Sequence, residues 1–194
     1  MTSSLHPGRT AFDQAPETAR GRATHRALLA VHAHIRRDLE TVQQLAVRAA
    51  DGLAPSQLRE QLDALKRGSF LWQLQVSCLR YCSFVHLHHH AEDADFFVEL
   101  RATNPAIGSV IDRLQAEHRR VSHDLDGVEA AANSLHREDT EHARQRVVEA
   151  LRALERNLLA HLDFEEGSIE ATVRRMRDWS EGTRAPGTIS GTRQ

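Results

Sequence analysis

Four long stretches of the sequence place apolar residues at every third or fourth position, with polar and charged residues between them. This period is typical of amphipathic α-helices that turn one face to a core. Gly52 follows the first stretch, and Pro105 lies between the second and the third. Since glycine and proline interrupt helices, these residues mark helix ends. The alternation typical of strands is not found. The pattern therefore predicts four long helices, over residues 24–50, 69–102, 105–134 and 139–178.

A shorter amphipathic segment, PSQLREQLDALKRG, lies between the first two stretches, at residues 55–68. Pro55 near its start and Gly68 at its end suit a short helix or a packed crossover. The whole pattern predicts an all-α fold, an antiparallel up-down four-helix bundle with a short extra helix between the first and second long helices. We expect three parts: an irregular N-terminal arm, the bundle and a flexible C-terminal tail, at residues 1–22, 23–179 and 180–194.

Charge and hydropathy narrow the classes of function. The chain of 194 residues carries 25 Lys and Arg against 27 Asp and Glu, so it lacks the basic surface that nucleic acid requires. Its first residues form no apolar signal segment, and no run reaches the length of a membrane span. We therefore expect a cytoplasmic protein that binds neither nucleic acid nor membrane. Cys78 and Cys82 lie four residues apart on one predicted helix, and we expect them to pack in the core.

Histidine is unusually frequent, with 13 residues in the chain, and it is the commonest metal ligand among the side chains. On a wheel of the second helix, His88 and Glu92 fall on the apolar face, whereas His86 and His90 fall on the opposite, solvated face. His89 is intermediate. A carboxylate on an apolar face is costly unless it is paired, and a metal ion is one possible partner. The spacing puts His88 and Glu92 one turn apart, which suits two ligands of one site.

Each of the other long helices also turns one histidine, His32, His118 or His161, toward its apolar face. On the fourth helix, Glu165 lies within the apolar stripe and Glu166 flanks it. One inward histidine is usually a hydrogen-bonded core residue, but four of them, two with nearby acids, predict a metal site in the bundle core. A ligand set without thiolate favours iron or manganese, with zinc possible. Two acids and four histidines indicate two metal ions rather than one.

The segments around these residues resemble those of a known family. His88 and Glu92 lie in HHHAEDADFF, His32 in LLAVHAHIRRDL, His118 in RLQAEHRRV and His161 in HLDFEEGSI. In this order and spacing, the segments resemble the hemerythrin-like, or HHE cation-binding, family over residues 24–178.

The resemblance implies a non-haem centre of two iron ions, oxo- or hydroxo-bridged. It assigns the histidines to the two irons in pairs, His32 with His88 and His118 with His161. Glu92 and an acid of the fourth helix would bridge the irons. The register of hemerythrin itself favours Glu166, whereas the wheel favours Glu165.

One position departs from the oxygen-carrying pattern of the family, which has two histidines four residues apart in the third helix. Leu114 stands at the first of these positions. One iron is therefore expected to lack a histidine ligand, and a water, another side chain or an open coordination position would replace it. Tyr81, two turns before His88 on the same face, could approach the centre, although a core tyrosine is the more common case. The departure argues against simple reversible oxygen carriage.

These features predict a di-iron protein that binds or reduces O2, peroxide, NO or a related reactive species. We expect an apolar shell around the centre to limit solvent access, with Val85, Phe96, Leu114 and Leu158 as its members. If the site turns over, the protein is a peroxidase, catalase or oxidase that requires an electron donor the sequence does not identify. The alternatives are a non-catalytic oxygen, redox or iron sensor, an iron-binding protein, and a metal-free structural bundle.

Overall fold

The computed structural model describes residues 12, 15–51, 70–135, 137 and 140–177. Within this part, regular secondary structure is helical. The elements are α1 (Ala19–Ala50), α3 (Phe70–Ala91), the π-helix η1 (Glu92–Phe96), α4 (Phe97–Thr103), the 3₁₀-helix η2 (Pro105–Ile107), α5 (Gly108–Leu135) and α6 (Glu141–Val173). The predicted short helix at residues 55–68 lies outside the described residues.

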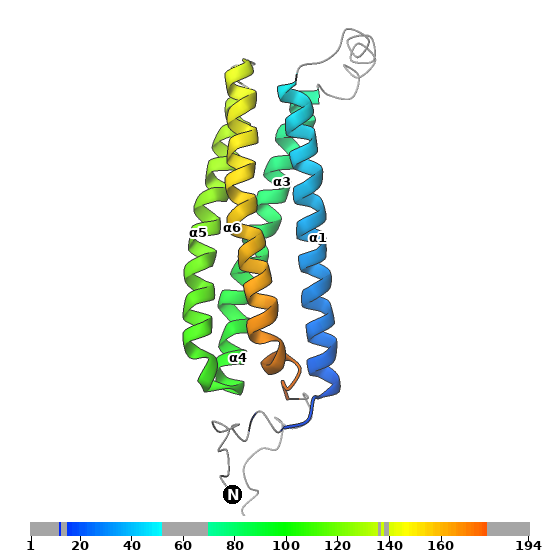
Figure 1. Cartoon of the computed structure of the whole chain (residues 1–194), viewed down its shortest axis with the longest axis vertical. Helices are drawn as coiled ribbons and strands as arrows, with labels where there is room; N and C mark the ends of the chain where they lie inside the picture. Colours follow the sequence, from blue (N-terminus) through cyan, green and yellow to red (C-terminus); the bar gives the residue numbers. More distant parts are fainter. Residues whose placement is uncertain (1–11, 13–14, 52–69, 136, 138–139, 178–194) are drawn as a thin grey trace, which may run out of the picture.

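The long helices form a bundle in which α1 and α5 run in one direction and α3 and α6 in the other (Figure 1). Each long helix contacts two neighbours: α1 and α5 both contact α3 and α6. The prediction of four long helices in a helical bundle is confirmed. None of the described helices is both long and apolar enough to cross a membrane.

The first helix begins earlier than the sequence pattern indicated. α1 starts at Ala19, because the Thr18 side chain accepts a hydrogen bond from the Gly21 amide at 2.8 Å and so caps the helix. The predicted irregular arm at residues 1–22 is therefore wrong over its last four positions. The Thr18 amide also donates to the Arg174 carbonyl at 2.9 Å, which ties the start of α1 to the end of α6. Glycine is needed at 21, since a Cβ there would lie 2.3 Å from the Arg174 carbonyl oxygen.

The core consists of two apolar clusters separated along the bundle axis. The larger one contains residues from all four long helices, including Ile35, Val85, Val121 and Leu162. Cys78 and Cys82 are buried in this cluster as free thiols, in keeping with a packing role, and burial raises the pKa of each to about 12.

The smaller cluster lies toward the opposite end of each helix. Its members are Leu28, Phe97, Leu100, Ile111, Leu114, Ile169, Val173 and Met176. On α1, for example, Leu28 belongs to the smaller cluster and Ile35 to the larger one. Buried polar residues fill the level between the clusters, and the metal-ligand types predicted from the sequence lie at this level.

Candidate metal centre

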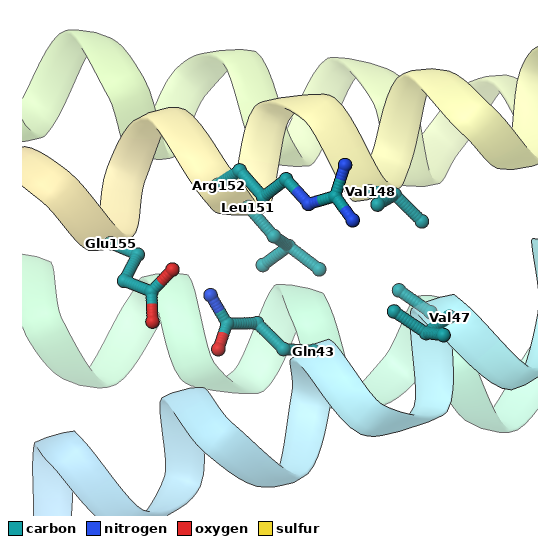
Figure 2. Close-up of a pocket in the computed structure, with 7 residues that line it drawn as sticks. Gln43, Val47, Val148, Leu151, Arg152 and Glu155 are labelled. Atoms are coloured by element: carbon teal, nitrogen blue, oxygen red, sulfur yellow. The ribbon is translucent and has the colours of Figure 1, made fainter.

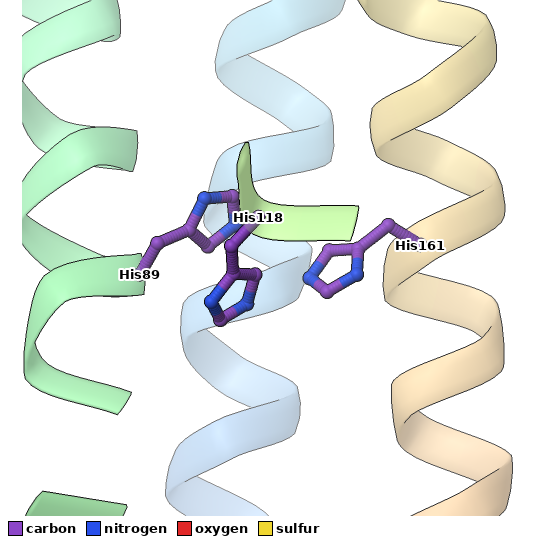
Figure 3. Close-up of side chains that lie close together, drawn as sticks. All are labelled: His89, His118 and His161. Carbon is purple, nitrogen blue, oxygen red and sulfur yellow. The ribbon is translucent and has the colours of Figure 1, made fainter. Parts of the chain in front are cut away.

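Five histidines and two glutamates converge between the two apolar clusters, and we call them the His/Glu cluster. They come from the four long helices and from the first residue of η1: His32, His88, His89, Glu92, His118, His161 and Glu165. Figure 3 shows three of these side chains, from α3, α5 and α6, directed toward one another. The structure thus brings together six of the seven residues predicted from the sequence, all except Glu166, and adds His89.

A carboxylate holds the outer ring nitrogen of three of these histidines. In each case Nδ1 donates to a side chain outside the cluster: His32 to Glu166 at 2.9 Å, His118 to Asp93 at 3.0 Å and His161 to Glu117 at 3.2 Å. Because a carboxylate only accepts, the proton lies on Nδ1 and the lone pair on Nε2. Such carboxylates orient the imidazole and raise its basicity in metal sites.

The atoms that face the middle of the cluster lack hydrogen-bond partners. They are the Nε2 atoms of all five histidines and both carboxylate oxygens of Glu92 and of Glu165. Buried polar atoms are almost always hydrogen-bonded, since an unpaired one costs about 1–3 kcal/mol. A concentration of nine such atoms in one layer is what a bound cation would explain, because each is a good ligand atom. The donor set therefore fits a metal.

The distances between these atoms suit shared coordination. Glu92 has Oε1 3.3 Å from His88 Nε2 and Oε2 3.6 Å from His118 Nε2. Glu165 has Oε2 3.5 Å from His32 Nε2 and 3.7 Å from His161 Nε2. Ligand atoms about 2.0–2.2 Å from one ion lie about 3–4 Å from one another. Each glutamate therefore reaches histidines on both sides of the cluster.

The cluster contains three compact groups of ligand atoms. Within each group, all the ligand atoms lie within 4.8 Å of one another. The groups are His32 with His88 and Glu92, His89 with His118 and His161, and Glu92 with His118 and Glu165. Because the first two groups share no residue, they define two halves. We call them the α1 half, with His32 and His88, and the α5 half, with His89, His118 and His161.

Burial keeps the imidazoles of the cluster in the form that binds a cation. It lowers the pKa of His32 to about 4 and the pKa values of His88 and His118 to about 3. Burial also lowers the pKa of His89 and of His161. These rings are therefore neutral at pH 7, with a free lone pair.

The two glutamates shift in the opposite direction. Burial raises the pKa of both Glu92 and Glu165, and the neighbouring Glu165 carboxyl group adds to the rise at Glu92. Bringing two carboxylates together in a dry core is unfavourable without positive charge. A bound metal ion would supply that charge and would favour the ionised form of both groups.

His89 is the cluster residue that the sequence prediction missed. Its ring stacks on His118 with centroids 4.1 Å apart and an interplanar angle of 12°. Leu114, the position at which the sequence lacks a histidine, is fully buried in the smaller apolar cluster. The helical wheel did indicate a buried position for His89. Its angle falls between those of Cys78 and Cys82, and both cysteines are fully buried.

Tyr81 does not take part in any of the three ligand groups. Its hydroxyl is buried without a hydrogen-bond partner, and burial raises its pKa. The side chain lies in the larger apolar cluster and borders a groove between α1 and α3, together with His34 and Phe84. His89, rather than Tyr81, is the residue that joins His118 and His161.

The two acids of the fourth helix have different positions. Glu165 is fully buried and faces the cluster, as the wheel favoured. The Glu166 side chain is 25 % exposed and accepts hydrogen bonds from His32 and, at 2.6 Å, from Arg36. Glu166 thus supports a histidine instead of joining the ligand groups.

The π-helix η1 changes which residues cover the cluster. A π-turn holds one extra residue, so the side chains after it are rotated relative to a continuous α-helix. Phe97 is therefore 1 % exposed and stacks on His118 at 5.3 Å, whereas Phe96 is only partly buried. The predicted shell residue Phe96 packs against the smaller apolar cluster from its edge, and Phe97 is the ring that contacts the His/Glu cluster. The other predicted shell residues, Val85, Leu114 and Leu158, are fully buried.

A small cavity elsewhere in the bundle is lined by residues outside the His/Glu cluster. It lies between α1 and α6, has a volume of about 140 Å³ and is lined by Gln43, Val47, Leu151 and Glu155 among others (Figure 2). Its lining contains no histidine and no residue of the His/Glu cluster. It therefore adds nothing to the metal-binding chemistry.

Comparison with known proteins agrees with this geometry. The family model described as the hemerythrin HHE cation binding domain matches residues 23–173, a range that contains the whole His/Glu cluster. Neither the search of curated proteins nor the search of solved structures found a match. A domain of this kind binds metal cations, typically iron, and the cluster supplies suitable ligands. The chain belongs to the hemerythrin HHE cation-binding domain family.

Proposed function

We propose that this protein holds two non-haem iron ions in the His/Glu cluster and binds or reduces O2, peroxide or a related reactive species there. The observation that carries the proposal is the layer of nine buried, unpaired ligand atoms between two apolar clusters. A carboxylate-bridged iron pair supplies redox chemistry that no side chain of the chain can supply alone.

The residues divide into bridging and terminal roles. Glu92 and Glu165 each reach both halves, so they are the proposed bridges. His32 and His88 serve the ion of the α1 half. His89, with His118 and His161, serves the ion of the α5 half. The α1 half offers one imidazole fewer, which leaves more room there for a small ligand.

The surroundings protect and orient this set. Phe97 and Leu114 close the cluster on one side, and Val85 and Leu158 belong to the apolar cluster on the other. Their apolar side chains exclude water and keep the local dielectric low. The carboxylates on Nδ1 of His32, His118 and His161 fix these three rings, so their ligand atoms need little rearrangement when a cation binds.

The test is metal analysis of the purified full-length protein, with near-ultraviolet absorption recorded before and after addition of peroxide. We expect about two iron ions per chain and absorption bands of a bridged iron pair. Bands that change and recover while peroxide is consumed would indicate turnover. Bands that change without consumption would indicate the alternative, a non-catalytic sensor or iron-binding protein.

His88→Ala provides the matched test of the ligand assignment, because the His88 side chain is 10 % exposed and turned to Glu92. We expect it to lower iron content. His34→Ala is the control, since this imidazole is 48 % exposed and pairs with Asp38 on the surface of α1. A folded wild-type protein that takes up no iron, or a His88→Ala variant with full iron content, would overturn the assignment.

A further inference from the structure

A second group of histidines lies outside the cluster, in a groove between α3 and α5. The groove has a volume of about 510 Å³, and we call it the α3–α5 groove. His86 and His90 on α3, and His123 and Asp126 on α5, line its outer part. Its inner part is lined by His89 and His118, which belong to the His/Glu cluster.

The inner wall of this groove is formed by two residues of the His/Glu cluster. His89 is 5 % exposed and His118 is 3 % exposed, and each has its Nε2 directed into the cluster. Three other pockets in the described part of the chain contain no residue of the cluster. Among these pockets, the α3–α5 groove is therefore the one that borders the α5 half from the solvent side.

The outer side chains have the chemistry of cation ligands. His86 has Nε2 3.8 Å from Asp126 Oδ1, so an imidazole and a carboxylate already face each other across the groove. Asp93, whose side chain is 37 % exposed, lies next to the cluster, because it accepts the hydrogen bond from His118. Imidazole and carboxylate together suit ferrous iron. Two carboxylates against the single guanidinium of Arg119 give the groove a net attraction for cations.

The outer residues are less tightly grouped than the cluster. Within the described residues, the compact groups of three ligands all lie in the cluster. Weak, transient binding by the outer residues fits an entry path. An ion that they held firmly would stay in the groove and would not reach the cluster. Stepwise replacement of water by ligands also reduces the cost of bringing a hydrated cation into a dry core.

We propose that the α3–α5 groove is the entry path for ferrous iron, with His86, His90 and His123 as its first ligands and Asp93 as the step before His89 and His118. This inference rests on the proposed function, since it requires the cluster to hold iron. It assigns a role to surface histidines that the metal centre itself does not use.

The test measures the rate at which metal-free full-length protein takes up ferrous iron without oxygen, with a chelator added at set times to trap unbound iron. The variant His90→Ala/His123→Ala removes two exposed groove imidazoles. We expect uptake at least about tenfold slower, with the same final iron content. The control, His34→Ala/His142→Ala, removes two exposed imidazoles from α1 and α6 and should load at the wild-type rate.

Release gives an independent readout. If the groove is a path and not part of the final site, the variant must also lose iron to a strong chelator more slowly by the same factor, because its affinity is unchanged. Arg119→Gln should accelerate uptake about twofold at low salt, and added salt should cancel that gain. Wild-type rates in His90→Ala/His123→Ala would overturn the path. Absence of bound iron in the wild type would instead overturn the proposed function.

Discussion

The two halves of the His/Glu cluster share one kind of support and differ in their surroundings. In the α1 half, Glu166 holds His32 and is itself held by Arg36 at 2.6 Å. In the α5 half, Glu117 holds His161 and is itself held by Arg113 at 2.8 Å.

The second outer carboxylate of the α5 half is the one that differs. His118 is held by Asp93, whose side chain borders the α3–α5 groove. Both halves thus contain a charged network, and among the described residues only the α5 half lines this groove.

This difference separates two demands on a buried metal site. A site that binds tightly needs ligands fixed by their surroundings, and a site that fills at all needs a way in. His32 and its network meet the first demand. Asp93, at the inner end of the groove, is placed to meet the second. Variants that act on one half and not the other would break this comparison or sharpen it.

The largest effect is expected for Glu92→Ala, which should abolish the binding of both ions. Glu92 contacts His88 through one oxygen and His118 through the other, so both halves lose a ligand together. Metal analysis after reconstitution measures the result. Glu166→Ala is the matched control, and we expect it to retain iron with weaker affinity. Equal iron content in both variants would contradict the assignment of Glu92 as a bridge.

Removing one imidazole from either half should abolish the binding of one ion only. His32→Ala is expected to lose the ion of the α1 half and His89→Ala the ion of the α5 half, so each variant should keep about one iron per chain. The double variant should keep none. Titration of metal-free protein with ferrous iron measures the number of sites. Two sites of unchanged affinity in His89→Ala would show that His89 is not a ligand.

The sequence was sufficient for residues whose position depends on helical periodicity alone. His32, His118 and His161 each lie on the apolar face of an uninterrupted helix, so a wheel places them correctly. The same wheel distinguished Glu165 from Glu166, although the family register favoured the other acid. These residues required no knowledge of how the helices pack.

Phe97 shows where periodicity fails. The segment Glu92–Phe96 contains neither proline nor glycine, so nothing local marks it as a π-turn, and the register beyond it is shifted. His89 precedes this turn, and its angle on the wheel already indicated a buried position. Its stacking on His118 is a contact between helices, and a single-helix pattern does not contain such contacts.

The stability of metal-free protein should have a maximum near pH 6.5. The cluster histidines have lowered pKa values, about 4 for His32 and about 3 for His88, so between these values and pH 6.5 the unfolded chain binds more protons. Stability then rises with pH. Glu92 and Glu165 have raised pKa values, so above about pH 4.5 the folded chain binds more protons, and their effect lowers stability as pH rises.

Below pH 6.5 the histidines outnumber the acids, and above it the acids act alone. Urea unfolding at pH 5, 6.5 and 8 measures the balance, and we expect a loss of about 1 kcal/mol or more from pH 6.5 to 8. Iron should abolish this alkaline loss, because it favours ionised carboxylates. Glu165→Gln should reduce the loss, whereas Glu166→Gln should not. An unchanged loss in Glu165→Gln would contradict the role given to burial of that carboxyl group.

A smaller effect is expected for Arg36→Gln, which loosens the network of the α1 half without changing a proposed ligand. Glu166 would keep its contact with His32 but lose the guanidinium that fixes it at 2.6 Å. The removal of a positive charge near the ions favours cation binding and partly offsets the loss of orientation. We therefore expect only about threefold weaker binding in the α1 half, well below the 10–100-fold typical of removing an outer hydrogen-bond partner.

Arg119→Gln is the variant to compare with Arg36→Gln, because Arg119 lines the α3–α5 groove beside the α5 half and is not part of the His/Glu cluster. If the halves differ as the structure indicates, Arg36→Gln weakens iron binding at an unchanged rate of uptake. Arg119→Gln then accelerates uptake and release together at an unchanged affinity. The affinity for iron and the rate of iron uptake, measured on both variants, test this difference between the halves. If both variants lost affinity for iron and neither changed in uptake rate, each arginine would only support its half. Iron would then not enter through the α3–α5 groove.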